Sequence, residues 1–436
     1  MCDTFTFFIG NIDICVIIYN YKKRGIIMNW KSKYDDKYAE FIIKFCFEKY
    51  KDRSLLIVPE DKEQLDFVEC LRDWGSKIGF NKIEIKLEDP EDMANYLNDT
   101  RLEDIELNEI FDKTKLSKYA LNGDCIIHIG SFNPITYNVD REKNKKSIEL
   151  MIPTIQGYIN NNTKYTFPWL IIGYPTTKWA NFLFPNDKNA YQKLYTNIIK
   201  ACMLDKEDSI GRWHKFIDYS NSLKQRFNED QYEKFIIENN LGTNLELGML
   251  PQYQFLNIDK VSPDGNHMID NFPSYEIFTT PDYRKTNGIV YNSKPLVYSN
   301  QIIDDFVLEF KNGIVTDFEC KVGKNLLESI LNIDGGNRLG EFAMVDMKLP
   351  LSKMNTVFYD TLYDENSSCH LALGRGNPTC LIGTTDKSNE NLLKNGVNVS
   401  SIHTDFMFGN DKTNIYGVKG LKKKLIMKNG IFVDNK

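Results

Sequence analysis

The sequence predicts an α/β protein, in which an N-terminal α/β domain with a largely parallel sheet is followed by a C-terminal domain of mixed α+β structure. Helical and strand patterns alternate along the first half of the chain, and short strands dominate the second half. A polar stretch separates these two patterns, and we place the domain boundary there. Residues 28–225 then form the N-terminal domain and residues 226–436 the C-terminal domain.

In the first half, stripes of apolar residues at helical spacing precede short apolar runs that are typical of buried strands. Strands that alternate with helices in this way are expected to pair in parallel, because each helix carries the chain back to the starting edge of the sheet. Helices are predicted at residues 35–50, 67–78 and 191–203, and strands at residues 55–58, 83–87, 125–129 and 169–172.

In the second half, the runs are shorter and turn residues separate them. Asn312-Gly313 lies between two alternating segments, which predicts a tight hairpin at that point. The predicted strands are residues 235–237, 288–291, 306–310, 315–320 and 397–408.

Composition excludes several functional classes. The 436 residues are 42% hydrophobic and 26% charged, as in a folded globular protein rather than a disordered one. A net charge of −6, with only short Lys/Arg runs, argues against a nucleic-acid or anionic-membrane partner. The nine cysteines include no Cys-x-x-Cys pair, which disfavours a zinc ribbon or a disulfide framework and favours a reducing, cytoplasmic location.

Residues 1–27 form a separate leader. Its apolar runs precede the basic cluster at residues 22–24, whereas a secretory signal carries its charge first. Polar residues interrupt the runs well before the ~20 apolar residues that a membrane span requires, so we expect no anchor. We interpret the leader as poorly ordered, or as the product of a start assigned upstream of Met28.

The chain lacks the familiar metalloprotease helix motif, the serine-hydrolase elbow and the phosphate-binding glycine loops. Its five histidines therefore draw attention. His403 and Asp405 share one face of a predicted strand, a pair that suits a divalent metal but more often forms a simple hydrogen bond. His370 is the second candidate, with a buried core histidine as the ordinary alternative.

Two glutamates, Glu276 and Glu341, lie among apolar residues. A buried carboxylate needs a cation, a metal or hydrogen-bond donors beside it, and composition does not decide among them. Several charged residues nearby are candidates for orienting a histidine or for binding a substrate carboxylate: Arg284, Arg338, Arg375, Asp364 and Glu365.

These residues occur within a series of motifs that resembles the thermophilic metalloaminopeptidase family, to which aminopeptidases T and S belong. The resemblance extends over residues 28–436, in matching order and spacing. The motifs are Glu276-Ile277-Phe278-Thr279-Thr280-Pro281-Asp282, Leu339-Gly340-Glu341, Asp364-Glu365-Asn366, His370 through Gly376, and His403-Thr404-Asp405-Phe406-Met407.

The resemblance implies a cytoplasmic, homodimeric metal-dependent exopeptidase that removes the N-terminal residue of short peptides. It assigns Glu276, Glu341, His370, His403 and Asp405 as ligands of two divalent ions, with zinc, cobalt or manganese preferred to magnesium. Two such ions provide hydroxide near neutral pH and polarise the scissile carbonyl. Glu341 or Glu276 would also carry the proton to the departing amine.

One position departs from the family pattern, which has a metal-site tyrosine where this chain has Asn377. Losing a phenol donor can cost on the order of 10²- to 10³-fold in rate. The first alternative is therefore a catalytically impaired metal- or peptide-binding homologue, unless Tyr359, Tyr363 or Tyr416 compensates. Two further alternatives are an amidase for N-blocked substrates and a nucleotide-dependent enzyme.

Overall fold

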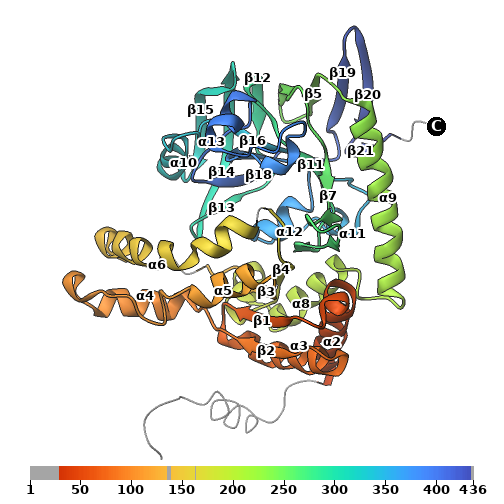
Figure 1. The fold of residues 1–436 in the computed structure, drawn as a ribbon. Coiled ribbons are helices and arrows are strands. Elements are labelled where there is room, and N and C mark those ends of the chain that lie inside the picture. The colour runs from red at the N-terminus through yellow and green to blue at the C-terminus, as the bar shows by residue number, and fades with distance from the viewer. Residues whose placement is uncertain (1–28, 135–138, 163, 434–436) are drawn as a thin grey trace, which may run out of the picture.

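The computed structural model describes residues 29–134, 139–162 and 164–433 (Figure 1). The predicted leader, residues 1–27, lies outside the described residues. The fold is mixed α/β, as the sequence predicts, with one parallel sheet and further antiparallel sheets. None of the helices in the described part is both long and apolar enough to cross a membrane.

The parallel sheet has the strand order β10-β4-β3-β1-β2 and lies in the N-terminal half. Every helix and strand predicted for this half is present, most with ends that shift by a few residues. The helix predicted at residues 35–50 is an α-helix only as far as Phe41, and a π-helical segment (Ile42–Phe47) and a 3-10 turn (Glu48–Tyr50) continue it. The strands are β1 (Ser54–Pro59), β2 (Lys82–Ile85), β3 (Cys125–Gly130), β4 (Trp169–Gly173) and β10 (Asn271–Phe272). The helices are α2 (Asn29–Phe41), α3 (Leu65–Ile78), α4 (Pro90–Asp99), α5 (Thr114–Asn122), α6 (Arg141–Asn162), α7 (Thr177–Leu183) and α8 (Ala190–Ala201).

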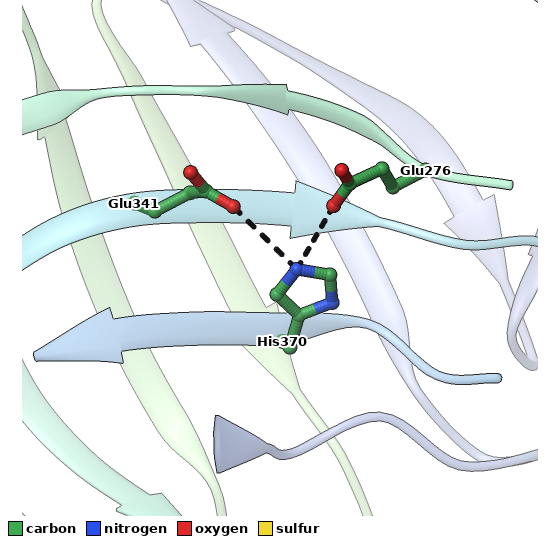
Figure 2. Close-up of side chains that lie close together, drawn as sticks. All are labelled: Glu276, Glu341 and His370. Atoms are coloured by element: carbon green, nitrogen blue, oxygen red, sulfur yellow. Dashed lines mark ion pairs between the residues drawn. The ribbon is translucent and has the colours of Figure 1, made fainter. Parts of the chain in front are cut away.

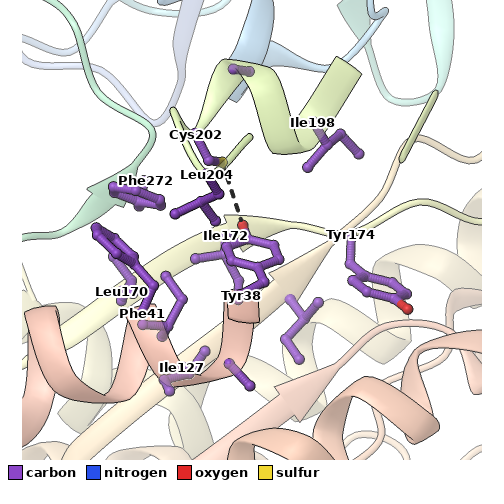
Figure 3. Packing of buried hydrophobic residues seen from close by; sticks show 14 of the residues in the cluster. Tyr38, Phe41, Ile127, Leu170, Ile172, Tyr174, Ile198, Cys202, Leu204 and Phe272 are labelled. Carbon is purple, nitrogen blue, oxygen red and sulfur yellow. Dashed lines mark hydrogen bonds between the residues drawn. The ribbon is translucent and has the colours of Figure 1, made fainter. Parts of the chain in front are cut away.

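Helices cover both faces of this sheet, which explains why its inner strands, such as β1 and β4, are almost continuously apolar. Leu55 and Ile57 belong to one core cluster with residues of α2, α3 and α8, whereas Leu56 and Val58 pack with residues of α5. Figure 3 shows the first cluster, where Phe272 of β10 joins residues of β3 and β4. A strand from beyond residue 226 thus completes the N-terminal sheet.

The polar stretch in which we placed the boundary forms a long helix, α9 (Ser209–Asp230), along one edge of the molecule (Figure 1). Trp213 packs on Phe272 in the N-terminal core, at 4.7 Å between ring centroids. Leu223 and Phe227 pack in the C-terminal core. The helix therefore contributes to both cores, and its polar composition reflects the residues that it exposes between these contacts.

The second half is mainly antiparallel. Its nine-stranded sheet follows the order β13-β14-β12-β6-β5-β19-β20-β21, with β15 paired to β14. The predicted hairpin at Asn312-Gly313 joins β14 to β15, and both residues have positive φ (50° and 80°), as a primed turn requires. The strands are β5 (Lys234–Glu238), β6 (Asn244–Met249), β12 (Pro281–Tyr291), β13 (Leu296–Tyr298), β14 (Gln301–Lys311), β15 (Ile314–Val322), β19 (Asn414–Lys419), β20 (Lys422–Lys428) and β21 (Ile431–Phe432).

A second antiparallel sheet, which we call the site sheet, has the order β18-β17-β16-β11-β7. Its strands are β7 (Leu256–Asn257), β11 (Ile277–Thr279), β16 (Leu339–Met344), β17 (His370–Gly374) and β18 (His403–Met407). One face, which carries Phe342, Leu371 and Phe406, shares a core cluster with residues of the nine-stranded sheet. The remaining elements are β8 (Lys260–Val261), β9 (His267–Met268), α10 (Lys324–Leu331), α11 (Pro350–Lys353), α12 (Thr361–Glu365) and α13 (Asn389–Lys394).

One predicted strand is wrong in extent. Residues 397–408 were expected to be a single strand, but β18 covers only His403–Met407. The preceding segment is a loop, in which the Asn398 side chain donates hydrogen bonds to the carbonyl oxygens of Gly335 and Gly374. These side-chain bonds, together with backbone bonds from Arg375 and Gly376 to the carbonyl oxygens of Ile402 and Asn398, hold the loop against distant parts of the chain.

Candidate metal centre

The five residues predicted to bind metal lie together on one face of the site sheet. Glu341 is in β16, His370 in β17, and His403 and Asp405 in β18, while Glu276 immediately precedes β11. The paired positions Glu341, Ala372 and Asp405 form a line across three strands. Residues of alternating position point to the opposite face and pack in the core, so the strand period itself sends these polar groups to one side.

Two local features allow the side chains to converge. The pairing of β16 with β17 shifts between Leu339 and Glu341, a bulge that re-aims the following side chain. Gly340 is required at this bulge, because a Cβ there would lie 2.4 Å from the carbonyl oxygen of Arg375. The residue of β17 that lies between Glu341 and Asp405 is Ala372, whose side chain is a single methyl group.

The cluster consists of two groups that share Glu341. In the first, Nε2 of His370 lies 3.0 Å from Oε2 of Glu276 and 3.5 Å from Oε1 of Glu341 (Figure 2). In the second, Nε2 of His403 lies 3.3 Å from Oδ1 of Asp405 and 3.8 Å from Oε2 of Glu341. Glu341 thus turns one oxygen toward each imidazole, as a carboxylate between two ions would.

The hydrogen bonding of the histidines favours metal binding. Nδ1 of His370 lies 3.1 Å from the Ser368 carbonyl oxygen, and Nδ1 of His403 lies 2.6 Å from that of Arg375. A carbonyl oxygen only accepts, so each Nδ1 carries a proton and each Nε2 faces the carboxylates. Despite these short distances, three atoms make no hydrogen bond of ordinary geometry: Glu276 Oε2, His370 Nε2 and Asp405 Oδ1. Buried nitrogen and oxygen atoms that converge without hydrogen-bonding one another are the ligand atoms that a divalent cation requires.

A third group includes a residue that the sequence placed in a supporting role. Ligand atoms of Glu365, His370 and Asp405 lie within 4.8 Å of one another. Glu365 ends α12, is buried, and accepts a hydrogen bond from the side chain of Asn366. Its acidic neighbour Asp364 accepts instead from the backbone N–H of Phe358 and does not line the site. Glu365 therefore adds a fourth carboxylate to the cluster.

The pKa directions show an excess of negative charge. Burial alone would lower the pKa of His370, but Glu276 and Glu341 outweigh it and raise that pKa well above its ordinary value. Burial would also lower the pKa of His403, but the charge of Asp405 outweighs burial and raises that pKa to about 10. Burial raises the pKa of Glu365, with the charge of Asp405 adding to it. Protons on the two imidazoles would offset only part of the charge of the four carboxylates, and divalent cations would offset it directly.

A cavity of about 260 Å³ opens over the cluster, with walls from both halves of the molecule. Tyr165 and Trp169 form part of the wall on the N-terminal side. Lys260 and Asp270 contribute a buried ion pair at 3.8 Å. The lining residues are Asn162, Tyr165, Trp169, Lys260, Asp270, Asn271, Glu276, Phe278, Glu341, Glu365, Arg375, Gly376, Asn377, Pro378, His403 and Asp405.

Asn377 lies in this wall, and its environment explains an amide there. It is the N-cap of the short turn Pro378–Cys380, and its Oδ1 accepts from the backbone N–H (3.0 Å) and the hydroxyl (2.6 Å) of Thr379. None of the three tyrosines proposed to compensate lines the cavity: Tyr359, Tyr363 and Tyr416. The phenol present is that of Tyr165, which the sequence analysis missed. No motif marks it, since it comes from the other half of the chain.

The three arginines considered for substrate binding lie in different environments. Arg375 lines the cavity, whereas Arg284 forms an ion pair with Asp282 and Arg338 lies over the ring of Tyr283. Cys369, next to His370, is buried, and burial raises the pKa of its thiol to about 11. That thiol is therefore not a nucleophile at neutral pH.

Comparison with known sequences identifies the family. The sequence model of the thermophilic metalloprotease (M29) family matches residues 32–432. The chain belongs to this family. A relative from Bacillus subtilis, aminopeptidase AmpS, is 30% identical over 322 residues, which are 71% of this chain and 77% of the relative.

Other relatives match over shorter stretches. Aminopeptidase 2 of Geobacillus stearothermophilus is 36% identical over 60% of this chain, and the match spans just under two thirds (64%) of that relative. Aminopeptidase T of Thermus aquaticus is 29% identical over 59% of this chain and 63% of its own length. The solved structure of wild-type AmpT from Thermus thermophilus shares the fold, with a TM-score of 0.82, 22% identity, and coverage of 92% of this chain and 99% of that one.

Proposed function

We propose that this chain is a metal-dependent aminopeptidase, which hydrolyses the first peptide bond of short peptides with water activated by two divalent ions. The relatives named aminopeptidases support the reaction class. The observation that carries the two-ion arrangement is the position of Glu341, whose two oxygens face the imidazoles of His370 and His403 separately.

We assign Glu276, Glu341 and His370 to one ion and Glu341, His403 and Asp405 to the other, because these are the groups whose ligand atoms converge. Mixed nitrogen and oxygen ligands suit zinc, cobalt and manganese better than magnesium. When bound, two such ions supply hydroxide at neutral pH and polarise the scissile carbonyl.

The chain's own residues complete the reaction. Both oxygens of Glu341 are turned toward imidazoles, so Glu276 is the better placed of the two glutamates to pass a proton to the departing amine. The backbone carbonyl oxygens of Ser368 and Arg375 hold the imidazole rings in orientation.

The size and charge of the cavity favour short substrates. Its volume of about 260 Å³ is below the roughly 300–1,000 Å³ that is typical of small-molecule pockets. It therefore accommodates one terminal residue and the adjoining peptide unit, not a folded chain. Arg375, an exposed cation on the wall, suits the carboxylate of a short peptide. We further propose a cytoplasmic homodimer, on the family resemblance and on the free, mostly buried cysteines of the described residues.

The test is turnover of unblocked amino-acid anilides and dipeptides by the full chain, loaded separately with zinc, cobalt, manganese or magnesium. We expect release from free N-termini only, and no turnover of N-acetylated substrates. Glu341→Gln should lose activity and bound metal together. Glu309→Gln, a matched change at an exposed position of β14, should retain both.

Each other outcome excludes something specific. Two bound ions per chain without turnover would support the impaired metal- or peptide-binding homologue expected from Asn377. Cleavage of N-acetylated amides would point to an amidase. Full activity in Glu341→Gln would refute the ligand assignment.

A further inference from the structure

Tyr165 is the one phenol in the described cavity wall, and it comes from the N-terminal half of the chain. It follows α6 and precedes β4, far from the site sheet in sequence, yet it shares the cavity with Glu341 and Asp405. Its side chain is 7% exposed. The hydroxyl of a buried tyrosine usually has a hydrogen-bond partner, and this cavity offers several polar groups.

The backbone of Tyr165 adopts an uncommon conformation that fixes the ring. Its φ is +54°, in the left-handed region that bulky residues rarely occupy, at a cost of order 1–3 kcal/mol. Its backbone N–H donates to the carbonyl oxygen of Asn162 (3.1 Å), and the indole N–H of Trp169 donates to the same oxygen (3.1 Å). The rings of Tyr165 and Trp169 are parallel, with an interplanar angle of 1°. Such conformations cluster at functional sites, where the surroundings hold them in place.

Asn377 completes the geometry. Its Oδ1 is engaged by both donors of Thr379, so its amide NH₂ is the part available to Tyr165. Burial raises the pKa of the Tyr165 phenol, and the side chain of Asn377 opposes that rise, the direction expected when an amide N–H faces the phenol oxygen. Both side chains line the same cavity. This arrangement leaves the proton of the phenol free to be donated to a third group in the cavity.

We propose that Tyr165 donates a hydrogen bond to the carbonyl oxygen of the scissile peptide, with Asn377 positioning it, and so supplies the phenol that the family pattern places at position 377. The inference rests on the proposed aminopeptidase function. Negative charge develops on that oxygen as water adds to the carbonyl carbon, and a fixed donor stabilises it there. The phenol would then come from position 165 instead of position 377, and Asn377 would not be a sign of lost activity.

The experiment uses Tyr165→Phe in the metal-loaded full chain. We expect kcat to fall about 10²- to 10³-fold with little change in KM, as for the loss of one oxyanion donor. Affinity for an α-aminophosphonate, which imitates the tetrahedral species, should fall in parallel. Metal content and metal affinity should stay unchanged, which separates a donor from a ligand.

Two further variants sharpen the test. The double variant Tyr165→Phe/Asn377→Tyr should have a kcat at least tenfold above that of Tyr165→Phe, because it restores a phenol to the cavity wall at position 377. Tyr253→Phe removes a buried hydroxyl that donates to the carbonyl oxygen of Tyr232 outside the cavity, and it should leave kcat unchanged.

The outcomes separate the two proposals. An active parent chain whose Tyr165→Phe variant keeps kcat and phosphonate affinity within threefold overturns the role of Tyr165 alone. Loss of bound metal in that variant overturns the donor role in favour of ligation. A parent chain without turnover on any unblocked substrate overturns the aminopeptidase function and the role of Tyr165 with it.

Discussion

Ala372 lies between Glu341 and Asp405, the two carboxylates of the proposed second ion site. It pairs with Glu341 of β16 on one side and with Asp405 of β18 on the other, and it is fully buried. Neighbouring strands lie about 4.8 Å apart, which separates the backbones of Glu341 and Asp405 by roughly 10 Å. Their ligand oxygens nevertheless lie within 4.8 Å of each other. Both side chains must therefore bend over Ala372.

Substituting Ala372→Val adds two methyl groups in this space. The strand itself tolerates valine, whose β-branched side chain suits a pleated sheet. Overpacking a buried position costs about 1–3 kcal/mol, and here the carboxylates can relieve the strain by moving apart. Metal binding must then restore the crowded arrangement and supply that free energy. We expect the dissociation constant of at least one ion to rise by about 5- to 150-fold.

The measurement is metal affinity by calorimetric titration, with metal content by mass spectrometry, on the folded full chain. Ala180→Val in α7 is the matched control, since Ala180 is equally buried but lies in the N-terminal core. It should lose stability without losing metal. Unchanged affinity for two ions in a folded Ala372→Val protein would refute the inference that the ligands converge across β17.

Three other predictions follow from the same structure. Replacing Arg375 with Gln should raise KM for dipeptides about tenfold, for one lost charge-assisted hydrogen bond, and leave KM for amino-acid anilides, which lack a carboxylate, unchanged in steady-state assays. Removing the ions with a chelator should lower the free energy of unfolding by about 3 kcal/mol per site, compared with protein in which the free ion is at 100 times Kd. Calorimetry should show this loss as a lower Tm, and added zinc should reverse it. Burial raises the pKa of Glu60 to about 7, so the folded state holds this proton more tightly than the unfolded state and stability falls as pH rises from 4.5 to 7. Glu60→Gln should therefore stabilise the protein by up to about 3 kcal/mol at pH 8 and hardly at pH 4.5 in urea unfolding, whereas Glu106→Gln, at an exposed position, should do neither.

The proximity of His403 and Asp405 could be predicted because its signal is local, whereas the set of five candidate ligands came from the family resemblance. His403 and Asp405 are two residues apart in a strand, a spacing that puts both side chains on one face without reference to the rest of the fold. Buried strands such as β1 are continuously apolar for an equally local reason, since helices cover both faces of their sheet. The extent of β18 was wrong because Asn398, just before it, bonds to distant backbone that the sequence pattern does not reveal.

The cavity wall could not be predicted, because it depends on how the two halves of the chain pack. Sequence reasoning sought a substitute phenol near the departure at Asn377 and named tyrosines that lie elsewhere. Tyr165 shares the cavity wall with Asn377 because the chain turns at a left-handed residue between α6 and β4, and because β10 and α9 join the two halves. A tyrosine with positive φ has no sequence signature. A substitution at a family position is therefore best judged by what occupies the same space, since a side chain from any part of the fold can fill it.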